Sequence, residues 1–322
     1  MEALCAFQLT EALKGAIELD VFTHIAGGAH TAAAIADRAG ASERGIRILC
    51  DYLTVHGFLG KDDGQYACSP TAAAFLDKRS PAYIGSIANF LANERIVKTY
   101  RNLAGAARKG GTMATSTVSP NDPVWVEFAR SMAPFLGMVA GILAPIVARP
   151  GEPQKVLDIA AGHGLFGLQV AKANPAAVVY GTDWADVLAV ALENAAALGV
   201  ADRYHTIPGS AFEVSLGSGY DLVLVPNFLH HFNPATNTAL LEKIRRAMTP
   251  GGTIAIVEFV PNEDRVSPPI AASFSLQMLG ATDGGEAYTF ADLDRMLGQA
   301  GFSDRRAQAL VPTPQTLVLA TA

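Results

Sequence analysis

Charge is scarce in this chain of 322 residues, since charged side chains make up 17% of it and the formal net charge is -6. A protein that binds nucleic acid through its phosphates needs a positive face, and a polybasic patch is needed to hold an anionic membrane surface. The charge balance therefore predicts neither nucleic acid nor membrane as a partner.

Cysteine is equally rare. The chain has Cys5, Cys50 and Cys68, with neither metal-ligand spacing nor the even framework of a disulfide scaffold. No apolar run stands out as membrane-spanning, and the start lacks the basic region of a signal peptide. These absences predict a cytoplasmic protein without a metal site, and its length allows two domains.

Small residues gather in one short segment. An apolar run over 156–160, with Asp158 inside it, leads into a turn that contains Gly162 and Gly164. An apolar-periodic stretch follows over 165–173, so the segment predicts a buried strand, a tight turn and a helix. A turn with almost no side chains lets a ligand lie against the backbone, and the helix points free N–H groups at that ligand.

A second acid follows at the expected distance. The apolar run 178–182 ends in Asp183, which is placed to accept both hydroxyls of a ribose. The two features together predict a nucleoside-containing cofactor, although a plain strand, turn and helix without ligand remains the simpler alternative. Gly162, Gly164 and Gly167 also fit the dinucleotide spacing, but Asp158 inside the strand argues against a nicotinamide dehydrogenase.

The rest of the C-terminal half continues the alternation of strands and helices. Strands are predicted over 220–225 and 253–257, with a helix over 236–248 between them and a Thr-Pro-Gly-Gly break before the second strand. A closing strand is predicted over 309–319. This order predicts an α/β fold with a parallel, doubly wound sheet and a cofactor at the carboxyl ends of its strands.

The N-terminal half reads as a winged helix. We predict a helix from Phe7 to Phe22, two further helices capped by Thr31 and Ser42, and a hairpin over 57–66. Over residues 1–86 about ten acids face seven bases, which argues against binding to DNA.

Taken together, these segments resemble class I methyltransferases that use S-adenosylmethionine, in particular plant-type small-molecule O-methyltransferases and their bacterial relatives. The acid, strand and Gly-x-Gly turn match motif I of that class, and Met248-Thr-Pro-Gly-Gly matches a pattern before its fifth strand. The N-terminal segments match as well, so the resemblance covers nearly the whole chain. It implies a winged-helix dimerisation domain over 1–85, a helical linker over 86–148 and a Rossmann-like methyltransferase domain over 149–322.

The resemblance also implies a site and a homodimer formed through the N-terminal domain. S-adenosylmethionine, which leaves as S-adenosylhomocysteine, would be held without a metal, and Trp184 could stack on its adenine. The implied cofactor residues are Asp158, Ala160, Gly162, Gly164, Asp183, Trp184, Ser210, Ala211, Phe212 and Asn227. A pocket for a small-molecule acceptor would be lined by Trp125, Phe128, Met132, His231, Phe274 and Met278, although core packing explains these side chains equally well.

His230 is the candidate for chemistry. It follows the fourth strand at the place where the family carries Leu-His-Asp-Trp with the histidine as general base, and His231 replaces the aspartate. Histidine suits removal of a hydroxyl proton near neutral pH. The alternative is a histidine that packs against the edge of the cofactor without catalysing anything.

Several positions depart from the family pattern. Ser210 replaces the aspartate that holds the adenine amino group, and Ala287 and Ala320 fill the places of the two glutamates that orient the base. Glu286 falls one residue early, while Glu258 could either polarise His230 or face solvent.

Two helical segments are expected near the acceptor. We predict a long linker helix over 124–147, after a loop from Gly110 to Pro123, and Arg130 on this helix could reach the cofactor carboxylate. A substrate lid or a core helix is predicted over 268–278.

With this resemblance, the sequence predicts a dimeric enzyme that transfers a methyl group from S-adenosylmethionine to a hydroxyl of a small, largely apolar acceptor, with an aromatic acceptor as one option. One alternative is a relative with altered chemistry or with a nitrogen or carbon acceptor. Another is a winged-helix regulator that senses the cofactor.

Overall fold

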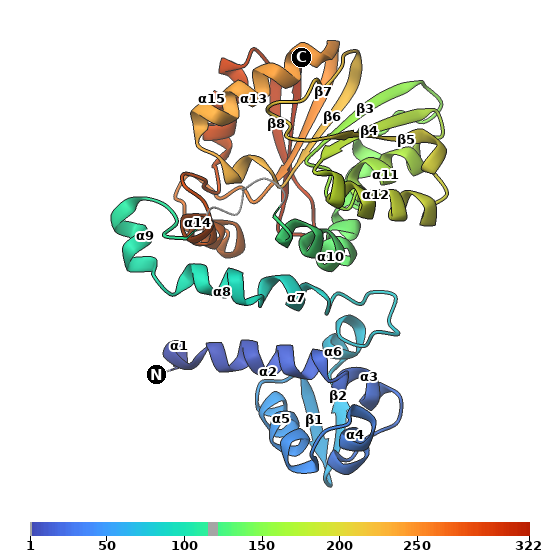
Figure 1. The fold of residues 1–322 in the computed structure, drawn as a ribbon, viewed down its shortest axis with the longest axis vertical. Helices are drawn as coiled ribbons and strands as arrows, with labels where there is room; N and C mark the ends of the chain where they lie inside the picture. The colour runs from blue at the N-terminus through green and yellow to red at the C-terminus, as the bar shows by residue number, and fades with distance from the viewer. Residues whose placement is uncertain (1, 115–121) are drawn as a thin grey trace. The chain divides into compact units, whose positions relative to one another are not determined.

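The computed structural model describes residues 2–114 and 122–322, and the chain divides into two compact units, residues 1–97 and 98–322 (Figure 1). The predicted loop from Gly110 to Pro123 lies partly outside the described residues, because 115–121 are not among them. The two units are described one at a time.

The N-terminal unit holds the expected helices and hairpin. Thr31 and Ser42 cap α4 and α5 by accepting hydrogen bonds from the backbone N–H of Ala34 and Gly45, which confirms both predicted caps. The elements are α1 Glu2–Cys5, α2 Phe7–Glu18, α3 Val21–Ala26, α4 Ala32–Ala39, α5 Glu43–Val55, β1 Leu59–Asp62, β2 Gln65–Cys68, α6 Pro70–Phe75 and α7 Ile87–Leu91.

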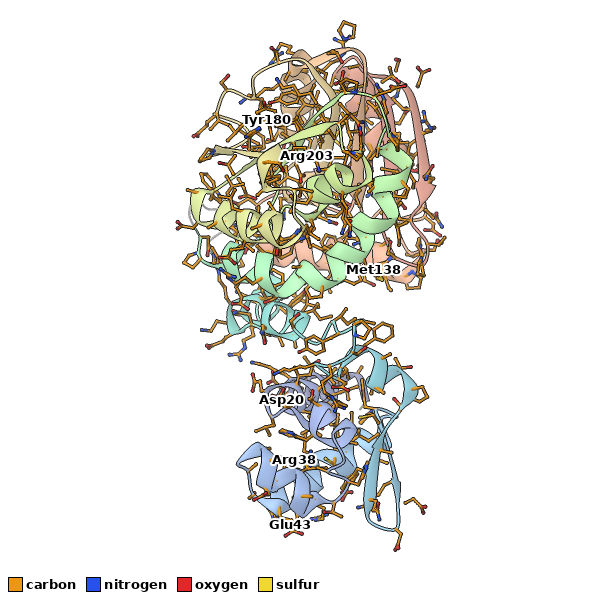
Figure 2. All side chains as sticks on the ribbon, turned by 90° about the vertical axis from the view of Figure 1, so that its right-hand side faces the viewer. Asp20, Arg38, Glu43, Met138, Tyr180 and Arg203 are labelled. Carbon is orange, nitrogen blue, oxygen red and sulfur yellow. The ribbon has the colours of Figure 1, made fainter. Side chains whose placement is uncertain are left out.

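The single helix predicted from Phe7 to Phe22 is wrong. Helix α2 ends at Glu18, and Asp20 adopts the left-handed conformation with φ 53° before α3 begins (Figure 2). The carboxylate of Asp20 is paired with the ammonium of Lys78. This break redirects the chain, and Val21 and Phe22 at the start of α3 are both buried in the core of the N-terminal unit.

The C-terminal unit is built on one sheet. Within the described residues the strand order is β5-β4-β3-β6-β7-β9-β8; neighbours are parallel from β5 to β7, and β9 runs antiparallel to both β7 and β8. The strands are β3 Gln154–Ile159, β4 Ala177–Asp183, β5 Tyr204–Pro208, β6 Tyr220–Pro226, β7 Met248–Glu258, β8 Ser303–Ala309 and β9 Thr316–Thr321.

Helices cover both faces of this sheet (Figure 1). On one face α10 (Val124–Val147), α11 (Leu165–Ala173) and α12 (Ala185–Ala197) bury one set of strand residues, and on the other α13 (Pro234–Ala247) and α15 (Phe290–Gln299) bury the alternate set. The order of the strands reverses between β3 and β6. A ligand of such a sheet binds at the carboxyl ends of the strands beside this reversal.

The linker helix α10 has the predicted bounds. By length and composition alone it is apolar enough to cross a membrane, so the prediction that no apolar run of the chain stands out in this way is wrong. Many of its residues, such as Leu136, Val139 and Leu143, are buried against α11 and the sheet, whereas Met138 points outward and is 43% exposed (Figure 2). An apolar helix with one face buried in this way is typical of the core of a globular protein.

The closing strand predicted over 309–319 has the wrong bounds, because residues 310–315 form the turn between β8 and β9; the antiparallel hairpin that the family resemblance implies for the last strands is present. Strand β8 ends at Ala309 and β9 begins at Thr316, and Leu310 N–H donates to the carbonyl of Gln315 to close the turn. Pro312 and Pro314 lie in this turn, and proline has no N–H to give to a ladder. The remaining elements are α8 Glu94–Tyr100, α9 Leu103–Lys109, η1 Ala201–Arg203, η2 Leu229–His231 and α14 Pro269–Ala281.

Candidate active site

The turn after β3 has the backbone that its glycines predict. Ala160, Gly162 and Gly164 all have positive φ, at 50°, 59° and 73°. A Cβ on Gly164 would lie 2.8 Å from the Cβ of Ala191 and 3.1 Å from Tyr204 Oη, so that position requires glycine. A Cβ on Gly162 would meet nothing closer than 3.8 Å, so this part of the turn leaves room beside the N-terminus of α11.

Asp183 joins this turn to the next helix. One carboxylate oxygen accepts from Gly162 N–H at 2.9 Å and the other from Trp184 N–H at 2.7 Å. Burial nevertheless raises the pKa of Asp183 to about 6. The carboxylate is thus fixed at the tip of β4, and its remaining lone pairs can accept hydroxyl donors.

Asp158 lies beneath the turn. It is fully buried, and Oδ2 accepts from Gly167 N–H at 3.0 Å in the first turn of α11. Among the described residues, Oδ1 has no hydrogen-bond partner, and burial raises the pKa of this carboxyl well above its usual range. Tyr204 Oη, also buried close to the turn, likewise has no hydrogen-bond partner in the described part of the chain.

Asn227 occupies the carboxyl end of β6 with φ 52°, and its backbone N–H donates to Val257 at 2.7 Å. Both polar atoms of its side chain are buried without a partner within residues 2–114 and 122–322. Native proteins rarely leave such groups unpaired. Unpaired polar atoms of Asp158 and Asn227 therefore flank the strand reversal, and they fit a ligand that carries an amino acid group.

The loop after β5 is held by a lysine. Lys243 on α13 donates to the carbonyl oxygens of Ala211, Phe212 and Val214 at 2.9, 2.8 and 2.7 Å. Ser210 Oγ accepts from Phe212 N–H at 3.3 Å. The ring of Phe212 lies edge-on to Phe232, with the centroids 4.8 Å apart, and also contacts Phe228 at 6.1 Å. The adenine loop expected at 210–212 is thus packed against the segment that carries His230.

The side chains of Trp184 and Arg130, both expected near the cofactor, contact other parts of the chain. Trp184 occupies the N-cap position of α12, and its side chain packs against the cluster of Ala129, Val187 and Val190, as does Trp125. Arg130 forms a bidentate ion pair with Glu193 at 2.8 and 3.0 Å, so its guanidinium is held by α12. Because of this pairing, the structure gives no support to the prediction that Arg130 reaches a cofactor carboxylate.

His230 is fixed by Glu258 at the end of β7. The Nδ1 atom of His230 lies 2.6 Å from Glu258 Oε2, and its backbone N–H donates to Oε1 at 3.3 Å. His230 is 5% exposed and Glu258 3% exposed. Of the two alternatives for Glu258, contact with His230 or exposure to solvent, the structure shows the contact with His230.

Aromatic rings surround this pair. The Phe274 ring of α14 lies edge-on to His230 at 4.8 Å and stacks on Phe259 at 4.3 Å. The His231 ring lies 4.3 Å from that of His230 and 5.4 Å from that of Trp125. Of the predicted acceptor pocket, His231 and Phe274 thus contact His230, and Trp125 contacts His231.

The other predicted pocket residues lie elsewhere. Phe128 contacts the edge of Trp125, but together with Met132 it packs against the core on the α10 face of the sheet. Met278 is 1% exposed within α14.

Among the described residues, Glu258 is the carboxylate that contacts the ring of His230. Glu286 pairs with Arg265 at 2.7 Å and is half exposed, while Ala287 and Ala320 are buried. Sequence reasoning missed Phe228, Phe259 and Lys243. For Phe259 a signal was available, because it follows Glu258 at the carboxyl end of a strand, where ligands bind.

The strand order, the glycine turn with Asp183 beside it and the buried His230–Glu258 pair are those of a class I methyltransferase. In the described part of the chain, no group of three His, Cys, Asp or Glu side chains is placed to hold a metal ion.

Comparison with known proteins gives the family. Residues 148–303 match the O-methyltransferase domain family, and residues 1–78 match the O-methyltransferase dimerisation domain. The chain is 30% identical over 327 residues to the tetracenomycin polyketide synthesis 8-O-methyl transferase of Streptomyces glaucescens, covering 99% of this chain and 95% of that protein. The chain belongs to the O-methyltransferase family.

Two solved structures of similar fold agree with this family assignment. A provisionally assigned O-methyltransferase from Nostoc punctiforme is 47% identical, with a TM-score of 0.96 over 100% of this chain and 97% of that one. PigF, a methyltransferase of a Serratia strain solved with S-adenosylhomocysteine, is 26% identical, with a TM-score of 0.85 over 100% and 98% of the two chains. The protein is an S-adenosylmethionine-dependent O-methyltransferase, which sets aside the nicotinamide dehydrogenase.

Proposed function

We propose that His230 is the general base that takes the proton of the acceptor hydroxyl. Glu258 accepts a hydrogen bond from Nδ1 of His230, which leaves Nε2 as the ring nitrogen that can take a proton. Bound S-adenosylmethionine supplies an electrophilic methyl group on its sulfonium. As the acceptor oxygen bonds to this methyl carbon and the carbon–sulfur bond breaks, the hydroxyl proton passes to Nε2. The His230–Glu258 contact is the observation that carries this function.

The chain's main contribution is alignment, because an in-line displacement depends on the placement of its two reactants. The cofactor residues proposed for this purpose are those predicted from the sequence. In this proposal Asp183 holds the ribose, the turn with Gly162 and Gly164 lies against the amino acid end, and Asp158 and Asn227 satisfy its polar groups. Ser210, Ala211 and Phe212 face the adenine, with Trp184 and Ala160 at the edges.

The acceptor that we propose is a small, largely apolar aromatic molecule. Its support is the set of rings around the two histidines, with Phe274 against His230 and with Trp125 and Phe228 against His231, since flat rings pack edge-on or offset against one another. The name of the Streptomyces relative, a polyketide 8-O-methyl transferase, agrees with an acceptor of this kind.

We further propose a homodimer that forms through residues 1–85, with 86–148 as linker and 149–322 as catalytic domain, and that works in the cytoplasm. The match of residues 1–78 to a dimerisation domain supports the dimer. The free cysteines agree with a reducing compartment. No observation favours the nitrogen or carbon acceptor or the regulator over this function.

The test begins with calorimetric titration of the purified protein with S-adenosylhomocysteine, with NAD as a parallel control. We expect binding of the first ligand alone. Methyl transfer to naphthols is then compared between the wild type and His230→Gln, and a loss of about 10²-fold in kcat with unchanged affinity for S-adenosylhomocysteine is expected of a lost base. Full activity of the variant would show that His230 only packs against the cofactor.

A further inference from the structure

The two ring nitrogens of His231 differ in burial. Its ring lies beside His230 and is enclosed by Trp125, Phe228 and Phe232, at centroid distances of 5.4, 6.4 and 6.2 Å. Nδ1 is buried and makes no hydrogen bond to any described residue. Nε2 makes none in the described part either, but it is not among the buried unpartnered atoms, so it keeps contact with solvent.

The ring is neutral. Burial, reinforced by the neighbouring His230, holds the pKa of His231 well below its usual range. A neutral imidazole has one N–H donor and one acceptor nitrogen. Buried N–H groups are left unpaired less often than buried acceptor atoms, so the proton belongs on the accessible Nε2 and not on the enclosed Nδ1.

His230 has the opposite tautomer. Its Nδ1 donates to Glu258 at 2.6 Å, so its own Nε2 is an acceptor. Two rings whose centroids are 4.3 Å apart therefore differ in what they offer: His230 accepts a hydrogen bond and His231 donates one. A ligand oxygen that bonds to one ring has its neighbouring atoms within reach of the other.

We propose that His231 recognises the acceptor by donating its Nε2–H to a second oxygen, next to the hydroxyl whose proton His230 removes. The substrate class is then an aromatic ring with two oxygens on adjacent carbons, of which one is methylated. This inference rests on the proposed function of His230. A site built to bond a substrate oxygen rejects the analogue without it, because its own polar group is then left unpaired.

The experiment compares 2,3-dihydroxynaphthalene with 2-naphthol, which lacks the second oxygen. Binding of each is measured with saturating S-adenosylhomocysteine present, so that chemistry does not enter. The wild type is expected to prefer the diol by about tenfold or more, a difference of about 1.4 kcal/mol. His231→Phe keeps an aromatic ring in the enclosed position, and it is expected to bind both compounds with similar affinity.

Two matched variants test which nitrogen acts. The amide nitrogen of glutamine reaches the place of Nε2, whereas that of asparagine reaches the place of Nδ1. We expect His231→Gln to restore the preference for the diol and His231→Asn to lack it. In ¹⁵N spectra of histidine-labelled protein, His231 is expected as the Nε2–H tautomer and His230 as the Nδ1–H tautomer.

The outcomes separate the two proposals. Equal affinity of the wild type for both naphthols, or an Nδ1–H tautomer of His231, overturns the role of His231 and leaves His230 untouched. Absence of binding by either naphthol, while S-adenosylhomocysteine still binds, refutes the aromatic acceptor itself and the role of His231 with it.

Discussion

At the scale of single residues, Glu258 replaces two family glutamates that this chain lacks. Both of its oxygens bond to His230, one to the ring and one to the backbone. Glu258→Gln keeps an acceptor but loses the charge that stabilises a protonated ring, and we expect kcat to fall by about 10- to 100-fold. Binding of S-adenosylhomocysteine should stay unchanged, and kcat equal to wild type would exclude this positioning role.

If Asp183 holds the ribose as proposed, cofactor binding should depend on pH. Its pKa is raised to about 6 by burial, so below that value the carboxyl is largely protonated in the free protein. Ribose hydroxyls donate to the ionised form and favour it. We expect affinity for S-adenosylhomocysteine to fall by up to about tenfold per unit as pH decreases below 6 and to level off above 7.

The control for this dependence is Asp183→Asn, which should bind the ligand weakly and with little slope between pH 5 and 7, about the range set by the raised pKa. The same shift acts on folding. Because the native pKa lies above the unfolded value, Asp183 lowers stability as pH rises from about 4 through 6. An asparagine at this position should therefore not reduce the free energy of unfolding at pH 7.

At the scale of elements, one lysine fixes the loop between β5 and β6. Lys243 of α13 bonds to three carbonyls of residues 211–214, and no backbone ladder holds that loop. Lys243→Met keeps the length of the side chain but leaves these carbonyls unpaired. We expect affinity for S-adenosylhomocysteine to fall by about tenfold.

Lys172→Met, on the exposed side of α11, is the matched control and should bind as the wild type does. At saturating cofactor the KM for the acceptor should be unaffected in Lys243→Met. An unchanged affinity for S-adenosylhomocysteine in that variant would show that the loop does not contact the cofactor.

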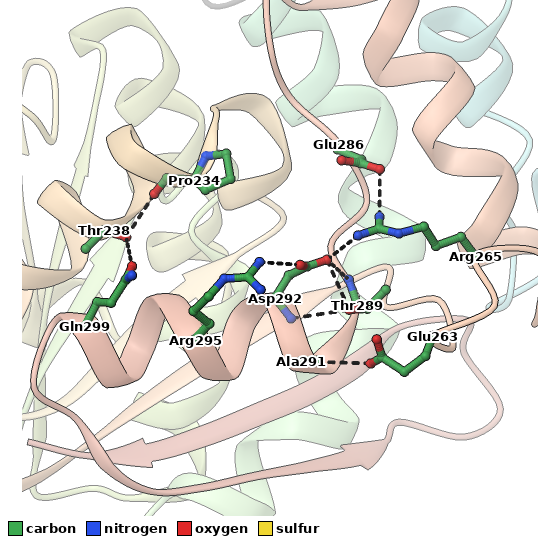
Figure 3. Close-up of polar contacts among 10 residues, drawn as sticks. All are labelled: Pro234, Thr238, Glu263, Arg265, Glu286, Thr289, Ala291, Asp292, Arg295 and Gln299. Carbon is green, nitrogen blue, oxygen red and sulfur yellow. Dashed lines mark hydrogen bonds and ion pairs between the residues drawn. The ribbon is translucent and has the colours of Figure 1, made fainter.

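Ion pairs of Arg265 connect the segments before and after α14, the helix that carries Phe274. Arg265, before α14, bonds to Glu286 and Asp292 after it, at 2.7 and 2.6 Å, and Asp292 also caps α15 through Thr289 (Figure 3). We expect Arg265→Ala to loosen α14 and to lower kcat/KM for the acceptor by a factor of about 3 to 10, as for loss of a surface ion-pair network.

Arg295→Ala is the comparison, since Arg295 bonds to the same Asp292 at 2.6 Å but does not bridge the two segments (Figure 3). Its activity should stay near that of the wild type. Equal losses in both variants would mean that the network acts through α15 and not through α14.

Particular elements show how far sequence reasoning reached. The strand–turn–helix with Asp183, the caps Thr31 and Ser42 and the long helix α10 were predictable, because each depends on local spacing. The break at Asp20 was not, since apolar residues recur every four positions across it. The His230–Glu258 contact joins residues 28 apart, one in η2 just after β6 and the other at the end of β7, and the pairing of β6 with β7 brings them together.

At the scale of the whole molecule, the N-terminal unit exposes apolar residues at its first helices. Leu4 is 83% exposed and Phe7 65% exposed. If they lie in the dimer interface, light scattering should give twice the mass of one chain for the wild type and a lower mass for Phe7→Asp. Burying a charge without a partner opposes association. A monomeric wild type would contradict the dimer.

The contacts of Phe212 also bear on the order of events in turnover. Its ring packs against Phe228 and Phe232, which flank the two histidines, so the loop proposed for adenine and the segment proposed for the acceptor share a wall. When the nucleoside binds and orders this loop, it also orders the shared wall before the phenol binds. Kinetics should then be sequential and ordered, with S-adenosylmethionine entering first and its demethylated product leaving last.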